Sequence, residues 1–204
     1  MKKYPEEKYN IVKLYIIDKK WSSVMIFEKP GKDNTDKTVE CAINAARERG
    51  IKYIILASHT GFTAKKFIGL DDIKVICVSG VNGAREKGVN SMPKEVRKEL
   101  IDAGIEVVTA THVLSGVERG ISSKFQGMYP AEIMAHTLRM FSQGVKVCVE
   151  IAIMALDADV IPFGEPVIAV GGTGNGADTV AIITPSHAAY VLETKVHEIL
   201  CKPY

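Results

Sequence analysis

Four short apolar runs, each ending in a loop of small or polar residues, constrain the fold of this chain more than any other feature. The runs cover residues 51–57, 73–78, 105–109 and 167–170. They are rich in β-branched residues, which is typical of strands buried on both faces of a parallel sheet. Segments that can form helices lie between the first three runs. This alternation predicts right-handed crossovers and a sheet covered by helices on both faces.

Helices are predicted where apolar residues recur at helical spacing or where caps and breakers bound a segment. The predicted helices cover residues 35–49, 93–103, 130–143 and 145–158. The last is apolar nearly all round and is expected at the centre of the fold. Its Glu150 needs a partner if buried, and we expect the partner to be Lys146; a ligand contact is the alternative. Residues 119–129 are expected to be irregular.

Further strands are predicted at both ends of the chain and after the glycine-rich segment. They cover residues 23–28, 179–184 and 195–201. The last alternates apolar and polar residues, as an edge strand does. We expect one domain over residues 1–204, in which residues 1–22 are an N-terminal extension and residues 185–204 a C-terminal edge element. Residues 11–17 can form another strand in that extension.

Composition excludes several classes of function. The chain has 204 residues and a net charge of +2, which gives no electrostatic reason to expect nucleic acid or an anionic membrane as partner. No apolar segment reaches transmembrane length, and the charged start does not read as a signal peptide, so we expect a cytoplasmic protein. The four cysteines are far apart in sequence. We expect reduced, mostly buried thiols and no metal site.

The loop after the first run, residues 58–64, is predicted to bind a phosphate. Ser58, Thr60 and Thr63 offer hydroxyl donors, and Gly61 lets the backbone approach a ligand closely. The residues that follow can begin a helix, whose free N–H groups and dipole favour an anion. The alternative is a well-capped turn followed by two solvated lysines.

The glycine-rich segment 171–178 is predicted to form a second ligand loop. Its G-x-G-x-G pattern is not a dinucleotide fingerprint, because a fingerprint opens a helix and a predicted strand follows here. A glycine-rich hairpin exposes N–H groups that can form an anion-binding nest. Thr173, Asn175 and Asp178 add polar contacts, and Asp178 can accept from a ribose, ribityl or sugar hydroxyl. A flexible hairpin tip without a ligand is the alternative.

Two histidines follow strand ends and can face the same crevice. His59 and His112 can each orient a ligand or act as acid or base near neutral pH, although a structural hydrogen bond is the alternative for either. Arg119 can hold a second anion or be solvated. No catalytic triad and no pair of catalytic carboxylates can be identified, so whether the protein is an enzyme stays open.

Two separated stretches resemble the C-terminal domain of pyruvate kinase. In that domain a helix of the type A-x-x-A leads to a strand and the loop T-x-S-G-x-(S/T)-A, and residues 38–67 are similar. The matching positions are Ala42, Ala45, Ala46, 54–56, Ser58, Thr60, Gly61, Thr63 and Ala64. Residues 167–185 look like that domain's last hairpin, V-V-T-G-(W)-x-P-G-S-G-x-T-N-T. The positions that fall near its glycines and polar tail are Gly172, Gly174, Gly176, Asp178 and Thr179.

The resemblance implies a fold and a ligand site. The implied fold is a three-layer α/β/α sandwich around a mostly parallel five-stranded sheet of order 3-2-1-4-5, whose last strand is antiparallel, here with extra edge strands. This order places the two loops side by side at the switch point, where open α/β sheets bind ligands. The family's barrel is absent from this chain, which excludes phosphotransfer from phosphoenolpyruvate. A homo-oligomer is expected by analogy.

Because the second loop lacks the family's Trp and basic residue, the expected ligand is not a sugar bisphosphate. We expect a nucleotide or phosphorylated metabolite, with FMN as the specific candidate, in a sensory or allosteric role. A flavin-dependent oxidoreductase and a partner-binding domain with an empty crevice are the alternatives. The residues expected at the site are Ser58, His59, Thr60, Gly61, Phe62, Thr63, Ala64, Gly80, His112, Gly171, Gly172, Thr173, Gly174, Asn175 and Asp178.

Overall fold

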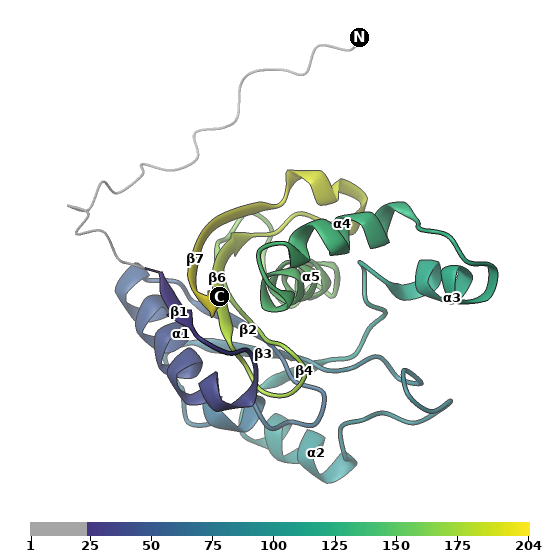
Figure 1. The fold of residues 1–204 in the computed structure, drawn as a ribbon. Helices are drawn as coiled ribbons and strands as arrows, with labels where there is room; N and C mark the ends of the chain where they lie inside the picture. The colour runs from purple at the N-terminus through teal and green to yellow at the C-terminus, as the bar shows by residue number, and fades with distance from the viewer. Residues whose placement is uncertain (1–23) are drawn as a thin grey trace.

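A seven-stranded sheet forms the centre of the computed structural model, which describes residues 24–204 (Figure 1). The predictions for residues 1–23 lie outside this part. The strands are β1 (Met25–Phe27), β2 (Tyr53–Ala57), β3 (Lys74–Val78), β4 (Glu106–Val108), β5 (Val167–Gly171), β6 (Thr179–Thr184) and β7 (Lys195–Pro203). The α-helices are α1 (Thr35–Arg49), α2 (Lys94–Asp102), α3 (Gly116–Phe125), α4 (Pro130–Arg139) and α5 (Gln143–Asp157). Short 3₁₀ helices are η1 (Lys32–Asn34), η2 (Ala64–Phe67) and η3 (Ala188–Glu193).

The strand order is β1-β7-β6-β5-β2-β3-β4. The five strands from β4 to β6 follow the expected order 3-2-1-4-5, and β6 runs antiparallel to β5. The two remaining strands extend the sheet beyond β6. β7 pairs antiparallel with β6, and β1 pairs parallel with β7. The expected mostly parallel α/β architecture is therefore confirmed.

Alternate residues of the central strands face opposite layers, as the pleat of a strand requires. Ile54 and Leu56 lie in one apolar cluster with Ala42 of α1. Ile55, which lies between them, belongs to a second cluster with Ile153 of α5. All five side chains are fully buried. This double burial explains why β2 is a continuous apolar run rather than an alternating one.

Two predictions about local structure are wrong. Residues 119–129 do not form one irregular segment, because α3 includes Gly116–Phe125. The apolar residues Val117, Ile121 and Phe125 repeat every four positions but are all exposed, so a helical pattern is present without a buried face. The C-terminal strand is not an edge strand, since β1 covers it. Its alternation reflects partial burial of its side chains rather than an unpaired backbone.

Candidate functional site

A cavity of about 460 Å³ lies at the carboxyl ends of β2 and β5. These strands pair directly, with Ile54 opposite Ile168, so the loops that follow them come together although they are distant in sequence. This juxtaposition is the one that the strand order implied. The cavity is lined by Lys32, Ala57, Ser58, His59, Thr60, Phe62, Thr63, Gln143, Val147, Gly172, Gly174, Asn175 and Gly176.

The loop that the sequence predicts to bind a phosphate, residues 58–64 and called the phosphate loop for that prediction, presents unpaired donors to this cavity. Within residues 24–204, the backbone N–H groups of residues 59–63 donate to no other protein group. The hydroxyl groups of Ser58, Thr60 and Thr63 line the cavity and likewise have no protein partner in this part of the chain. Ser58 and Thr63 are buried, whereas Thr60 is exposed. Buried donors need an acceptor, which water or a ligand oxygen can supply.

Gly61 is required by the shape of this loop. Its φ of +88° lies in the left-handed region, which L-residues rarely adopt. A Cβ atom at this position would also overlap the side chain of Val96, which belongs to α2. The backbone of the loop therefore packs closely against the Val96 side chain of α2.

The prediction that an α-helix begins after the phosphate loop is wrong. Only the four-residue 3₁₀ helix η2 follows, so the donors come from the loop itself and not from a helix N-terminus. The two lysines in η2 are paired with carboxylates. The Lys65 Nζ atom lies 2.7 Å from Glu99, and that of Lys66 lies 2.5 Å from Asp36. Neither ammonium group needs a phosphate to balance it.

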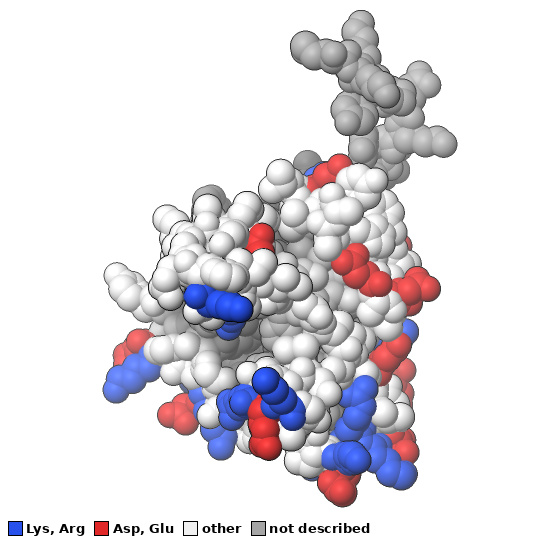
Figure 2. All heavy atoms as spheres, turned by 90° about the vertical axis from the view of Figure 1, so that its right-hand side faces the viewer, with Lys and Arg blue, Asp and Glu red and all other residues white. Residues whose placement is uncertain are grey.

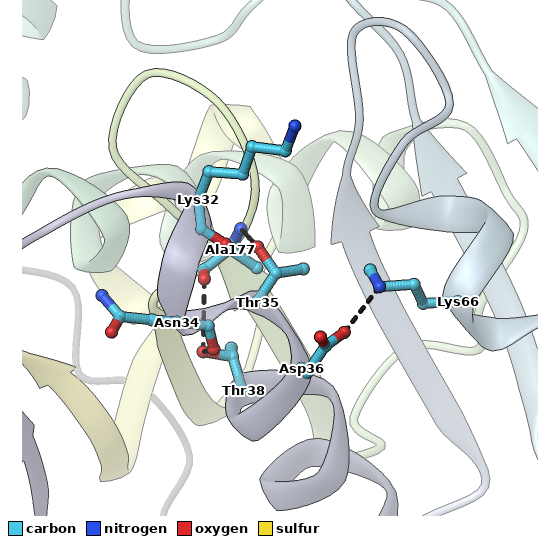
Figure 3. A network of polar contacts seen from close by, with 7 residues as sticks. All are labelled: Lys32, Asn34, Thr35, Asp36, Thr38, Lys66 and Ala177. Atoms are coloured by element: carbon cyan, nitrogen blue, oxygen red, sulfur yellow. Dashed lines mark hydrogen bonds and ion pairs between the residues drawn. The ribbon is translucent and has the colours of Figure 1, made fainter.

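The glycine loop, residues 171–178, is confirmed as a hairpin between β5 and β6. It is anchored from below by the start of α1 (Figure 3). The backbone N–H of Ala177 donates to Thr35 Oγ1 at 3.1 Å, and Thr38 Oγ1 donates to the Ala177 carbonyl at 3.3 Å. Thr35 in turn donates to the carbonyl of Lys32 at 2.6 Å. These bonds connect the hairpin, α1 and the loop after β1.

Asp178 lies beneath the hairpin and not in the cavity. Its side chain is fully buried, and its two oxygens accept from three protein donors. Oδ2 accepts the backbone N–H groups of Gly31 at 2.9 Å and Thr173 at 3.1 Å, and Oδ1 accepts the Thr179 hydroxyl at 2.8 Å. We therefore correct its expected role: Asp178 holds the loop and does not bind a ligand hydroxyl.

The other predicted residues divide into two groups. Those that line the cavity are Ser58, His59, Thr60, Phe62, Thr63, Gly172, Gly174 and Asn175. Those that do not are Gly61, Ala64, Gly80, His112, Gly171, Thr173 and Asp178. The glycines of the second group pack closely against neighbouring segments. Gly171, for example, leaves no room for a Cβ against the Gly144 carbonyl of α5.

The sequence interpretation missed a cation at the cavity. Lys32, in the loop after β1, places its Nζ atom 4.6 Å from the centre of the Phe62 ring. Within the described chain Lys32 forms no ion pair, and no Asp or Glu lines the cavity. In the sequence, Lys32 follows Pro30 and Gly31 just after a predicted strand, which marks it as a loop residue. Its position at the cavity could not be predicted without knowing that β1 joins this sheet.

The N-terminus of α5 was missed as well. Gln143, the first residue of this 15-residue helix, lines the cavity. Its Oε1 atom accepts from Arg139 Nε at 2.7 Å, which leaves the amide NH₂ without a protein partner in the described chain. Because the first residue of α5 lines the cavity, the positive end of the helix dipole also lies next to it. The predicted helices 130–143 and 145–158 left Gly144 between them, whereas Gly144 belongs to the first turn of α5 and packs against Thr179.

The two histidines form a stacked pair. The ring centres of His59 and His112 lie 6.3 Å apart, with 30° between the ring planes. Burial lowers the pKa of both imidazoles, and each has a further cation nearby, Arg85 for His59 and Arg119 for His112. Of the two histidines, only His59 lines the cavity.

One face of the molecule is hollowed. It carries α3 and the loop before α2, and Lys and Arg side chains lie on both sides of the hollow (Figure 2).

Glu150 has the structural partner that the sequence predicted. Its carboxylate pairs with the buried Lys146 ammonium one turn earlier in α5 and accepts the Leu114 backbone N–H at 3.1 Å. His112 Nδ1 lies 3.9 Å from the same carboxylate. The buried pair of Lys146 and Glu150 thus lies next to His112, and Glu150 does not line the cavity.

Residues 24–204 contain neither a metal-binding cluster nor a membrane-spanning helix. No three His, Cys, Asp or Glu side chains in this part are grouped to hold a metal ion. No helix in this part is both long and apolar enough to cross a bilayer.

The fold and site define a small α/β domain with a ligand-sized cavity at the switch point of its sheet. Residues 36–183 match the family described as the pyruvate kinase alpha/beta domain, and the chain belongs to this family.

Two solved structures of Cryptosporidium parvum pyruvate kinase are also similar. The first is 16% identical, with 72% of this chain and 22% of that chain covered and a TM-score of 0.38. The second, in complex with ADP, is 15% identical, with 81% and 23% covered and a TM-score of 0.37. This chain spans less than a quarter of their length.

Proposed function

We propose that the protein binds a phosphorylated small molecule, a mononucleotide such as FMN, between the phosphate loop and the glycine loop. The observation that carries this proposal is the charge and donor content of the cavity. Unpaired backbone N–H groups, three unpaired hydroxyl groups, the Lys32 ammonium and the start of α5 all border it, and no carboxylate does. Such a concentration of donors suits a phosphate dianion.

The remaining lining suits an aromatic heterocycle attached to that phosphate. Phe62 is 38% exposed and Val147 borders the same space, so both can contact a flat ring. Asn175 and Gln143 offer amide groups for its polar edge. The volume of about 460 Å³ lies within the usual range of small-molecule sites. We place this binding in the cytoplasm and assign it a sensory or allosteric role, in a homo-oligomer by analogy with the family.

The first test is an absorbance spectrum with denaturing mass spectrometry on protein purified without added ligand. A co-purifying flavin or nucleotide supports the proposal. If the protein is empty, FMN is titrated by calorimetry into the wild type and into a Thr60→Ala/Thr63→Ala double variant. We expect the double variant to lose about tenfold in affinity, which corresponds to one or two hydrogen bonds to a charged group.

Thr137→Ala is the matched control, because Thr137 lies on the exposed surface of α4. Equal FMN affinity in all three proteins contradicts the site assignment. If none of the three proteins binds FMN, AMP or simpler phosphate esters, the cavity is not a phosphate-ligand site, and the partner-binding alternative gains support. Gly61→Val is unsuitable here, because the clash with Val96 would disturb the loop itself.

A second candidate, a flavin-dependent oxidoreductase, is favoured by one observation. His59 borders the cavity with an imidazole whose pKa is lowered by burial, so it can be neutral near pH 7 and exchange protons with a bound ligand. Oxidation of NADH or NADPH by FMN-loaded protein, above the rate with free FMN and reduced in His59→Gln, would support this candidate. Binding without turnover would leave the first proposal alone.

A further inference from the structure

The backbone around Gln143 is held on both sides of this residue. Gln143 begins α5 and lines the cavity. Just before it, the Ser142 hydroxyl accepts the Val145 backbone N–H at 3.0 Å and so caps the helix. Just after it, Gly144 packs against Thr179 so closely that no Cβ atom would fit. The side chain of Gln143 therefore starts from a fixed point at the rim of the cavity.

The side-chain amide of Gln143 can face Arg139 with only one of its two ends. The Nε–H group of Arg139 donates to Gln143 Oε1 at 2.7 Å. A guanidinium group carries donors only and stays charged at physiological pH. The NH₂ end of the amide would set a donor against a donor, so the amide oxygen must face Arg139.

The NH₂ group of Gln143 is consequently left for the cavity. Within residues 24–204 it donates to no protein group. No buried side-chain nitrogen or oxygen in this part of the chain lacks a hydrogen-bond partner, so this NH₂ group is accessible from the cavity. Val147 lines the cavity one helical turn later, on the same face of α5. A ring that packs on Val147 thus has an edge near the Gln143 donor.

We infer that Gln143 selects ligands whose ring presents a carbonyl oxygen to it over ligands that present an amino group there. This inference rests on the proposed mononucleotide site and names the class of ring that the site prefers. The hypoxanthine of IMP, the uracil of UMP and the pyrimidinedione end of FMN present such an oxygen. AMP and CMP carry an amino group at the corresponding position, which would oppose one donor to another.

The other uncharged polar side chains of the cavity do not make this choice. The hydroxyl groups of the phosphate loop can donate or accept by rotation. Asn175 has no protein partner for its side chain within the described residues, so its amide can turn either end to a ligand. The imidazole of His59 can change tautomer. Gln143 differs from these groups because Arg139 fixes its polarity.

The test compares nucleotides that differ only in the group that Gln143 would meet. IMP and AMP form one pair, UMP and CMP the other, and each is titrated by calorimetry into the wild-type protein. Sugar and phosphate are the same within a pair, so the ratio of the two affinities reports on the ring alone. We expect IMP to bind about tenfold more tightly than AMP, and UMP about tenfold more tightly than CMP, because one hydrogen bond is replaced by two opposed donors.

Two outcomes would overturn the inference in different ways. Equal affinities within both pairs would overturn this inference alone and leave the mononucleotide site standing. If neither these four nucleotides nor FMN binds, the proposed site fails and the inference fails with it.

Variants of the pair test the orientation of the amide. Gln143→Glu keeps an acceptor for Arg139 and turns an acceptor oxygen to the cavity, so the ratio of IMP to AMP affinity should fall at least about tenfold. Arg139→Met frees the amide to rotate and should bring the ratio below about three. The general repulsion between a new carboxylate and the phosphate cancels in this ratio.

Gln126→Glu is the matched control, because it adds the same charge at an exposed position that does not line the cavity. It should keep the wild-type ratio. Circular dichroism confirms that each variant is folded before affinities are compared. A wild-type ratio in Gln143→Glu would overturn the inference.

Discussion

The carboxylate of Asp178 accepts the backbone N–H of Gly31 at 2.9 Å, across 147 positions of sequence. This bond connects the glycine loop to the segment that carries Lys32. The same oxygen accepts the Thr173 N–H, so one buried side chain fixes both loops relative to each other. The site therefore depends on a charge that never reaches the cavity.

Removing that carboxylate should destabilise the protein and abolish ligand binding together. Asp178→Ala leaves two backbone donors and the Thr179 hydroxyl without their acceptor in a buried position. We expect a loss of about 2–4 kcal/mol in the free energy of unfolding, measured by urea denaturation. Asp71→Ala, an exposed control, should change it by less than about 0.5 kcal/mol. Equal effects of both substitutions would contradict the anchoring role.

Lys32 should contribute affinity without contributing stability. Lys32→Gln removes the ammonium group at the cavity, and we expect FMN affinity to fall about tenfold, with a weaker dependence on salt. The midpoint of thermal unfolding should stay within about 2 °C of the wild type, because the side chain is exposed. Lys29→Gln, three positions earlier on the surface, is the matched control. An unchanged affinity in Lys32→Gln would remove this lysine from the site.

Removing one partner of the buried pair of Lys146 and Glu150 should lower the free energy of unfolding far more than replacing both partners by apolar residues. Glu150→Ala leaves the Lys146 ammonium buried without a counter-charge, and we expect a loss of about 3–5 kcal/mol in the free energy of unfolding. Lys146→Met/Glu150→Leu removes both charges and should recover most of that loss. Asp102→Ala, which breaks the exposed pair with Lys98, should cost less than about 0.5 kcal/mol. A double variant no better than Glu150→Ala would show that the charges themselves are required.

The stacked histidines should make stability depend on pH below neutrality. Burial lowers the pKa of His59 and His112 below the ordinary value of 6.5, so the unfolded state binds protons that the folded state does not. The free energy of unfolding should therefore be flat above about pH 7 and fall as pH decreases below 6.5. Urea denaturation between pH 5 and 8 measures this slope, and His59→Gln/His112→Gln should reduce it. An identical slope in the double variant would contradict the lowered pKa values.

The sequence by itself determined the order of elements and the position of the loop after β2, residues 58–64. Continuous β-branched runs are buried on both faces, and their small-residue ends mark the carboxyl edge of a parallel sheet, so β2 and its loop could be recognised from local pattern. Glu150 and Lys146 could be paired because residues four apart lie on one face of a helix. These features depend on neighbours in the chain.

Only the tertiary structure decided which distant groups share the site. Asp178 looked like a ligand contact, and the fold buries it under three donors. Lys32 lies at the cavity because the strand that precedes it, β1, pairs with β7 at the far side of the sheet. Each of these relationships joins segments more than 100 positions apart, and hydrophobic periodicity carries no information about such pairings. They are set by the strand order and by how closely the layers pack.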